Sequence, residues 1–203
     1  MIVTDRRQTA GRPLYDVVQA ALDGGVRAVQ LREKDLEGGE LYRLAVRLRD
    51  LTARYAARLL INDRLDVALA AGADGVHLGQ TSLPVSTARQ LLGPGKLIGV
   101  STHSPDEITA AQGADFVVFG PVYFTPSKAD YGQPQGVARL RQAARHSPVP
   151  VFAIGGIQAD RIAAVRRAGA HGIALISALS AAAEPSRAAH ELLTRLGPPD
   201  KAD

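Results

Sequence analysis

Eight short apolar runs recur along the chain, and a longer amphipathic segment follows each of them. Strands buried on both faces with regular crossover helices are typical of an open doubly wound sheet or a closed barrel, and eight units favour closure. The sequence therefore predicts an α/β protein with a (β/α)8 TIM barrel. The expected strands span residues 2–4, 28–32, 59–62, 75–78, 97–100, 116–120, 151–155 and 172–176. The expected helices, with apolar residues at helical spacing, span 14–22, 39–55, 65–70, 85–92, 105–111, 137–145, 159–168 and 185–196.

A single domain over residues 1–203 is expected, because 203 residues, 46% of them hydrophobic, suit one well-cored barrel with brief loops. A weak internal repeat supports the regular alternation of strands and helices. Residues 72–76, 113–117 and 169–173 each join a helix end to a strand start through a glycine, which we expect to cap the helix.

Composition argues against several functional classes. The net charge is +4, but basic residues are scattered among acidic ones and the aromatic residues are only five Tyr and four Phe, so we expect no nucleic-acid partner. No apolar run approaches the roughly 20 residues that span a bilayer, and residues 1–7 lack a signal-peptide layout. We therefore expect no membrane partner and a cytoplasmic location. The absence of cysteine excludes thiolate chemistry.

Polar residues gather where the expected second strand ends. Gln30, Arg32 and Lys34 alternate along an extended run, which would aim them at one locus. Two cations and an amide suit a diphosphate or carboxylate, and arginine can bind two oxygens at once. The alternative is a charged strand end in which Arg32 pairs with Glu33 or Asp35.

The third and fourth expected strands also end in polar side chains. Asn62 and Asp63 could position a substrate or hold a hard divalent cation, or they could cap the helix that begins near Leu65. His77 lies within the fourth strand. A lone histidine in a barrel wall is more often a satisfied core residue than a catalyst.

His103 follows the fifth strand, just before a helix that Ser104 should cap with Pro105 at its first position. Capping explains Ser104 but not His103. Because an imidazole titrates near neutrality, His103 is the leading candidate for general acid/base catalysis. The alternative is a solvated loop histidine.

The loop at 123–136 is rich in Pro and Gly and carries a donor cluster of Thr125, Ser127 and Lys128, which suggests a mobile lid.

Glycines at the end of the seventh strand suggest a phosphate site. Gly155 and Gly156 let backbone amides approach an anion, and Ile176 and Ser177 open a helix after the eighth strand. Barrels commonly bind phosphate at these last two loops.

Ordered motifs over nearly the whole chain resemble the thiamine phosphate synthase and TenI superfamily. They lie at residues 4–6, 30–34, 61–64, 77–80, 99–103, 120–122, 125–128, 155–157 and 176–178. The resemblance implies a barrel enzyme that acts on thiazole phosphate in thiamine biosynthesis, and it is compatible with a homo-oligomer.

The resemblance also implies substrate contacts at several strand ends. In a synthase the diphosphate would contact Gln30, Arg32, Lys34 and Lys128, the diphosphate and Mg2+ would contact Asn62 and Asp63, and the thiazole phosphate would contact Gly156, Ile176 and Ser177. Gly155 would share the phosphate loop. We also count Ser101, Thr125 and Ser127 among the residues expected to contact substrate.

Two features separate the branches of this superfamily. Synthases carry a second metal-ligating Asp where this chain has Ser82, and the sixth loop looks more like that of TenI relatives. We therefore expect a TenI-type tautomerase that aromatises a carboxylated thiazole phosphate through His103 without a cofactor. The alternative is the Mg2+-dependent synthase, which joins hydroxymethylpyrimidine diphosphate to thiazole phosphate. A third interpretation is a non-catalytic, ligand-binding regulator.

Overall fold

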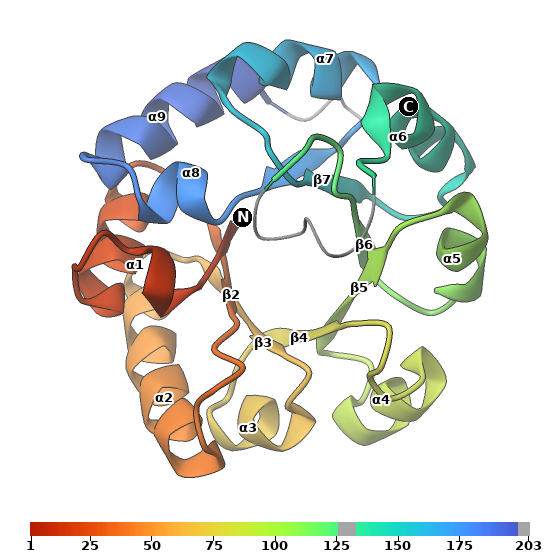
Figure 1. Ribbon diagram of the computed structural model, residues 1–203. Coiled ribbons are helices and arrows are strands. Elements are labelled where there is room, and N and C mark those ends of the chain that lie inside the picture. The colour runs from red at the N-terminus through yellow and green to blue at the C-terminus, as the bar shows by residue number, and fades with distance from the viewer. Residues whose placement is uncertain (126–132, 199–203) are drawn as a thin grey trace.

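The computed structural model describes residues 1–125 and 133–198, and these residues form a (β/α)8 barrel. Eight parallel strands pair in chain order, and Ile2 bridges in parallel to Leu175, which joins the first strand to the chain just after the last one (Figure 1). The predicted fold class is confirmed. The strands are β1 (Ile2–Val3), β2 (Ala28–Leu31), β3 (Arg58–Asn62), β4 (Gly75–Leu78), β5 (Leu97–Thr102), β6 (Phe116–Phe119), β7 (Val151–Ile154) and β8 (Gly172–Ala174).

Helices surround the ring of strands in chain order (Figure 1). The α-helices are α1 (Leu14–Asp23), α2 (Gly38–Arg54), α3 (Leu65–Ala70), α4 (Val85–Leu92), α5 (Pro105–Ala110), α6 (Gly136–His146), α7 (Ile162–Arg167), α8 (Ser177–Ser180) and α9 (Pro185–Leu196), and short 3-10 helices span η1 (Arg6–Gln8) and η3 (Ala159–Arg161). The helix expected over 159–168 is thus divided between η3 and α7. Within the described ranges, no helix combines the length and apolar character needed to cross a membrane.

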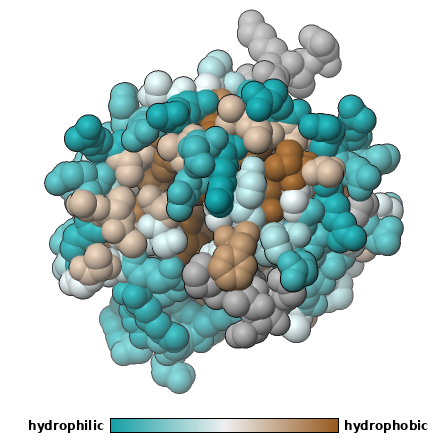
Figure 2. All heavy atoms as spheres, turned by 45° about the horizontal axis from the view of Figure 1, so that its top comes forward, coloured by the Kyte–Doolittle hydropathy of each residue, from teal (hydrophilic) through white to brown (hydrophobic). Residues whose placement is uncertain are grey.

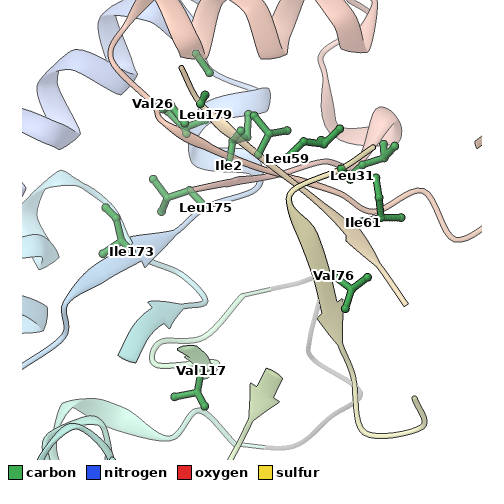
Figure 3. Packing of buried hydrophobic residues seen from close by; sticks show 14 of the residues in the cluster. Ile2, Val26, Leu31, Leu59, Ile61, Val76, Val117, Ile173, Leu175 and Leu179 are labelled. Atoms are coloured by element: carbon green, nitrogen blue, oxygen red, sulfur yellow. The ribbon is translucent and has the colours of Figure 1, made fainter. Parts of the chain in front are cut away.

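Strand residues alternate between the helix-facing side and the barrel interior. On β3, Leu59 and Ile61 belong to the large core beneath the helices, whereas Leu60 belongs to a separate inner cluster. Figure 3 shows the outer core, with side chains of Leu59, Ile61 and Val117 among its labelled members. The inner cluster consists of Val3, Leu60, Phe116, Val118 and Ala174, with Met1, Leu97, Phe152, Ile154 and Ile176 packed against it.

Two of the three repeated helix-to-strand joints carry an aspartate that accepts a hydrogen bond from the preceding strand. Asp74 accepts the Leu59 N–H at 2.7 Å, and Asp115 accepts the Ile98 N–H at 2.7 Å, so each carboxylate ties its segment to the preceding strand. Arg49 and Arg58 pair with Asp74, and Arg89 pairs with Asp115. The glycines predicted to end these helices, Gly72, Gly113 and Gly169, all have positive φ.

Candidate active site

A cavity of about 660 Å³ lies at the carboxyl ends of the strands, where Asn62, His77 and Ser101 meet the loops after β6, β7 and β8. Its floor includes the inner-cluster residues Val3 and Val118. Figure 2 shows one face of the protein, on which apolar surface appears in hollows between hydrophilic side chains. The predicted site residues that line the cavity are Gln30, Arg32, Asn62, Ser101, His103, Thr125, Gly155, Gly156, Ile176 and Ser177.

Three predicted positions do not line the cavity. Lys34 is exposed, because β2 ends at Leu31 and the extended alternation expected to align Lys34 with Arg32 does not continue. Asp63 and Ser82 also lie outside the lining. Ser127 and Lys128, and with them most of the proposed lid, fall outside the described residues.

Arg32 is held in place through its backbone, and its acidic neighbours are occupied by another arginine. The Arg32 N–H donates to the buried Thr4 hydroxyl at 2.8 Å. Arg6 donates its backbone N–H to Glu33 at 3.1 Å and its guanidinium to Asp35 at 2.8 Å. The alternative in which Arg32 pairs with either acid is therefore wrong. No carboxylate of the described residues forms an ion pair with Arg32.

Gln30 and Asn62 form a polar layer above the apolar floor. The Gln30 amide donates to Asn62 Oδ1 at 3.0 Å, and both side chains line the cavity. Neither Asn62 nor Asp63 caps α3, whose N-cap is Arg64 and lacks a side-chain cap hydrogen bond. The capping alternative is wrong.

Asp63 has an unusual backbone conformation, with φ of 66°. Positive φ is rare outside glycine and marks functional sites when the surrounding structure enforces it. Here the Asp63 N–H donates to the His77 carbonyl at 2.9 Å, and the carboxylate is exposed without a hydrogen bond from any described side chain. In the segment after β4, the Ser82 hydroxyl accepts the Gly79 N–H at 2.6 Å.

The exposed Asp63 carboxylate bears on the magnesium ion that the resemblance implies. No cluster of three metal-ligating side chains exists among residues 1–125 and 133–198. Mg2+ needs no such cluster, since it commonly binds one or two carboxylates together with substrate phosphates and water. The Asp63 carboxylate fits that mode, with the substrate supplying the remaining charge.

His77 lies in the cavity wall, with Nε2 2.8 Å from Ser101 Oγ. Burial, and secondarily the charge of Arg32, lowers the pKa of His77 to about 4, so the ring is neutral at physiological pH. The residue is 3% exposed, and Nδ1 has no partner among the described residues. His77 is therefore a core residue, as expected, but only one of its two ring nitrogens has a hydrogen-bond partner among the described residues.

His103 is half-buried and anchored at two points. Its backbone N–H donates to Glu107 at 2.7 Å, and its Nδ1 hydrogen-bonds to the Gly120 carbonyl. Because a carbonyl only accepts, Nδ1 carries a hydrogen. The solvated-loop alternative is wrong, and the predicted cap is confirmed, since Ser104 accepts the Glu107 N–H.

The loop after β7 requires glycine at two positions. Gly155 and Gly156 have φ of 99° and 61°, and a Cβ on Gly156 would lie 2.4 Å from the Phe124 carbonyl oxygen. Ser177 then begins α8, with Ile176 at its N-cap position. The strand expected over 172–176 is shorter in the structure, since β8 ends at Ala174 and Leu175 forms only an isolated bridge to Ile2. The backbone of Gly155 and Gly156 and the side chain of Ser177 therefore line this end of the cavity.

Arg161 is a cavity residue that the sequence did not reveal. Its guanidinium donates to the Gly156 carbonyl at 2.5 Å and lies 4.6 Å from the centre of the Tyr123 ring. The sequence placed Arg161 inside a regular helix, and nothing in the local pattern indicates these contacts between two loops. Arg161 therefore joins the β7 loop to the β6 loop.

A (β/α)8 barrel with amides, imidazoles, a glycine loop and an arginine that is unpaired among the described residues at its strand ends is typical of enzymes that bind phosphorylated ligands. Residues 1–179 match the family model described as thiamine monophosphate synthase. The chain belongs to this family, and it is an enzyme of thiamine biosynthesis.

Individual relatives agree with this assignment. The chain is 55% identical to a putative thiamine-phosphate synthase of Geobacter sulfurreducens, over 97% of this chain and 93% of the relative. It is 48% identical to a thiamine-phosphate synthase of Synechocystis sp., over 90% of this chain and 54% of that longer relative. A solved structure of thiamine phosphate pyrophosphorylase from Pyrococcus furiosus superimposes with a TM-score of 0.88 at 37% identity, covering 96% of this chain and 93% of that one. These relatives support the synthase alternative and do not support the predicted tautomerase.

Proposed function

We propose that this protein is a thiamine-phosphate synthase, which joins hydroxymethylpyrimidine diphosphate to thiazole phosphate and releases diphosphate. The observation that carries the proposal is that one cavity is lined both by Arg32, unpaired among the described residues, and by the Gly155 and Gly156 loop. A volume of about 660 Å³ suits two small phosphorylated molecules together. The names of the relatives support the same reaction.

In the proposed reaction the exocyclic carbon–oxygen bond of the pyrimidine breaks, and its electron pair leaves with the diphosphate. The thiazole nitrogen then uses its lone pair to form the new carbon–nitrogen bond. No proton is transferred, so the reaction needs stabilised charge and orientation more than an acid or base. This accounts for an arginine in the cavity, and it removes the acid/base role expected for His103.

Arg32 binds the diphosphate in this account, with Gln30 and Asn62 positioning the substrate around it. At the other end, the amides after β7 and the Ser177 hydroxyl hold the thiazole phosphate, which orients the attacking nitrogen. Bound Mg2+, held by Asp63 and the diphosphate oxygens, would neutralise charge on the leaving group. A cytoplasmic location and self-association stay predictions.

The two branches of the family are distinguished by assaying both reactions on the same purified protein. One sample receives hydroxymethylpyrimidine diphosphate, aromatic thiazole phosphate and Mg2+, and the other receives carboxythiazole phosphate alone. We expect thiamine phosphate from the first and no aromatised product from the second. Aromatisation without thiamine phosphate would reverse the assignment, and tight binding without either product would support the ligand-binding regulator.

A further inference from the structure

The contact between His77 and Ser101 has no role in the reaction described so far. Both residues line the cavity, and the imidazole Nε2 lies 2.8 Å from the hydroxyl oxygen. His77 is almost completely buried, whereas Ser101 is half-exposed at the cavity surface. A buried ring therefore supports a hydroxyl that a ligand can reach.

The imidazole is held in one position by its neighbours. His77 pairs in register with Gly99 on β5, where a Cβ would lie 2.8 Å from His77 Nδ1 and 2.2 Å from the Phe116 ring. The Phe116 ring itself lies 6.1 Å from the imidazole, centre to centre. Ser101 is also fixed through its backbone, because the Gln80 amide donates to its carbonyl at 3.0 Å. Neither partner has much freedom to reorient.

The surroundings select one tautomer of this neutral ring. If Nδ1 carried the hydrogen, a buried N–H would be left without a partner, since no described residue bonds to Nδ1. An orphaned buried N–H is rarer in proteins than an orphaned acceptor. With the hydrogen on Nε2 instead, the ring donates to Ser101 Oγ, and Nδ1 is a buried acceptor without a partner among the described residues.

We propose that His77 is a positioning residue, whose Nε2–H donates to Ser101 so that the serine hydroxyl must direct its own hydrogen into the cavity. Ser101 then presents a donor, and the ligand atom opposite it is a hydrogen-bond acceptor, such as a nitrogen of an uncharged heteroaromatic ring. The identity of that ring as part of a substrate rests on the proposed function. The assignment of the His77 tautomer does not depend on the proposed function.

Nitrogen NMR of protein labelled with 15N-histidine tests the tautomer directly, because protonated and bare ring nitrogens resonate at different shifts. His103 serves as an internal reference, since its Nδ1 hydrogen-bonds to the Gly120 carbonyl and must carry the hydrogen. We expect His77 to show the hydrogen on Nε2 and His103 to show it on Nδ1. A hydrogen on Nδ1 of His77, or a charged ring at neutral pH, would overturn the proposal.

The nitrogen signals of His77 are assigned by their absence from the spectrum of the His77→Gln variant. If that variant does not fold, replacing the other four histidines in turn identifies His77 by elimination, so the tautomer is still measured.

Calorimetric binding of thiamine phosphate tests the functional consequence, with inorganic diphosphate as the control ligand. His77→Leu removes the donor, whereas His77→Gln places an amide N–H where Nε2 was. We expect His77→Leu and Ser101→Ala each to weaken thiamine phosphate about tenfold, the value of one hydrogen bond. The double variant should be no weaker than Ser101→Ala, His77→Gln should restore most of the affinity, and diphosphate should bind equally to all.

Additive losses in the double variant, or equal weakening of diphosphate, would mean that His77 acts on the cavity at large and not through Ser101. Failure of the proposed function is recognised separately. In that case the wild-type protein would make no thiamine phosphate, while the NMR result on His77 would be unaffected.

Discussion

Ser82 sits in a turn whose hydrogen bond would tolerate a carboxylate. Its hydroxyl accepts the Gly79 N–H at 2.6 Å, and an aspartate oxygen can accept the same bond. On the sequence alone, Ser82 favoured a tautomerase over a synthase, because the resemblance implies a second metal-ligating Asp at this position in synthases. In the proposed function the exposed Asp63 carboxylate supplies one magnesium ligand, so a synthase does not depend on a carboxylate at position 82.

Ser82→Asp should lower the Mg2+ concentration needed for half-maximal thiamine phosphate formation. We expect the added negative charge to strengthen Mg2+ binding by about the free energy of one charge-assisted hydrogen bond. This lowers the required Mg2+ concentration about tenfold. Steady-state rates over a Mg2+ titration measure the change. Thr81→Asp adds the same charge at an exposed neighbouring position and is the matched control. An identical shift in both variants would point to general electrostatics instead of a ligand at position 82.

His103→Asn should reduce synthase turnover by less than about tenfold, because the proposed reaction transfers no proton, whereas acid/base residues contribute about 10² to 10⁴. Asparagine places an amide N–H where Nδ1 was, so the bond to the Gly120 carbonyl can persist. The measurement is kcat with both substrates saturating. A loss of several hundredfold with unchanged KM would restore His103 as an acid/base catalyst.

The loop after β7 is the element that holds the thiazole phosphate in the proposed function. Gly156→Ala forces a Cβ to within 2.4 Å of the Phe124 carbonyl oxygen at a φ of 61°, so the loop must move. We expect KM for thiazole phosphate to rise at least about tenfold, with a smaller change for the diphosphate substrate. Gly11→Ala is the control, because Gly11 has φ of 80° and a Cβ there would meet no other atom within 4 Å. Equal effects of the two variants would show that backbone strain, and not the phosphate loop, is responsible.

Joints between helices and strands stabilise the opposite end of the barrel. Burial alone would raise the pKa of Asp74, but the Leu59 N–H and the neighbouring Arg58 and Arg49 outweigh it and hold the pKa below its usual value near 3.8. A carboxylate with a depressed folded-state pKa stabilises the protein above its unfolded-state pKa, and this stability is lost as pH falls through both values.

Asp74→Asn should therefore lower the free energy of unfolding by about 1–3 kcal/mol at pH 7 and reduce the loss of stability below about pH 4. Urea unfolding at several pH values measures both effects. Asp50→Asn, at an exposed position on α2, should change neither. A stability difference that persists undiminished at pH 2 would contradict the electrostatic explanation.

Sequence patterns predicted the strands and helices because buried parallel strands are continuous apolar runs and the helices are amphipathic. Element ends were harder to predict, since pairing between strands decides them. The last strand ends at Ala174, where Leu175 forms only an isolated bridge to Ile2 of β1, so it is shorter than expected. The second strand stops before Arg32, which removed the alignment expected for Lys34.

At the scale of the whole molecule, the barrel explains why most predicted site residues converge. Inward-facing positions at the carboxyl ends of strands meet in one cavity whatever their separation in the chain. Side-chain contacts between neighbouring elements could not be predicted from the sequence in the same way. The pairing of His77 with Ser101 depends on the register of β4 and β5 around Gly99, and Arg161 reaches across to Tyr123 from a different loop.

The measurement that tests the central claim most directly is the stoichiometry of diphosphate release by the purified protein in Mg2+. The account predicts that diphosphate and thiamine phosphate appear together, one for one, only when hydroxymethylpyrimidine diphosphate and thiazole phosphate are both present. Arg32→Met should abolish both products in parallel. Diphosphate release without thiazole phosphate, or no thiamine phosphate from the complete mixture, would contradict the claim that this cavity joins the two substrates.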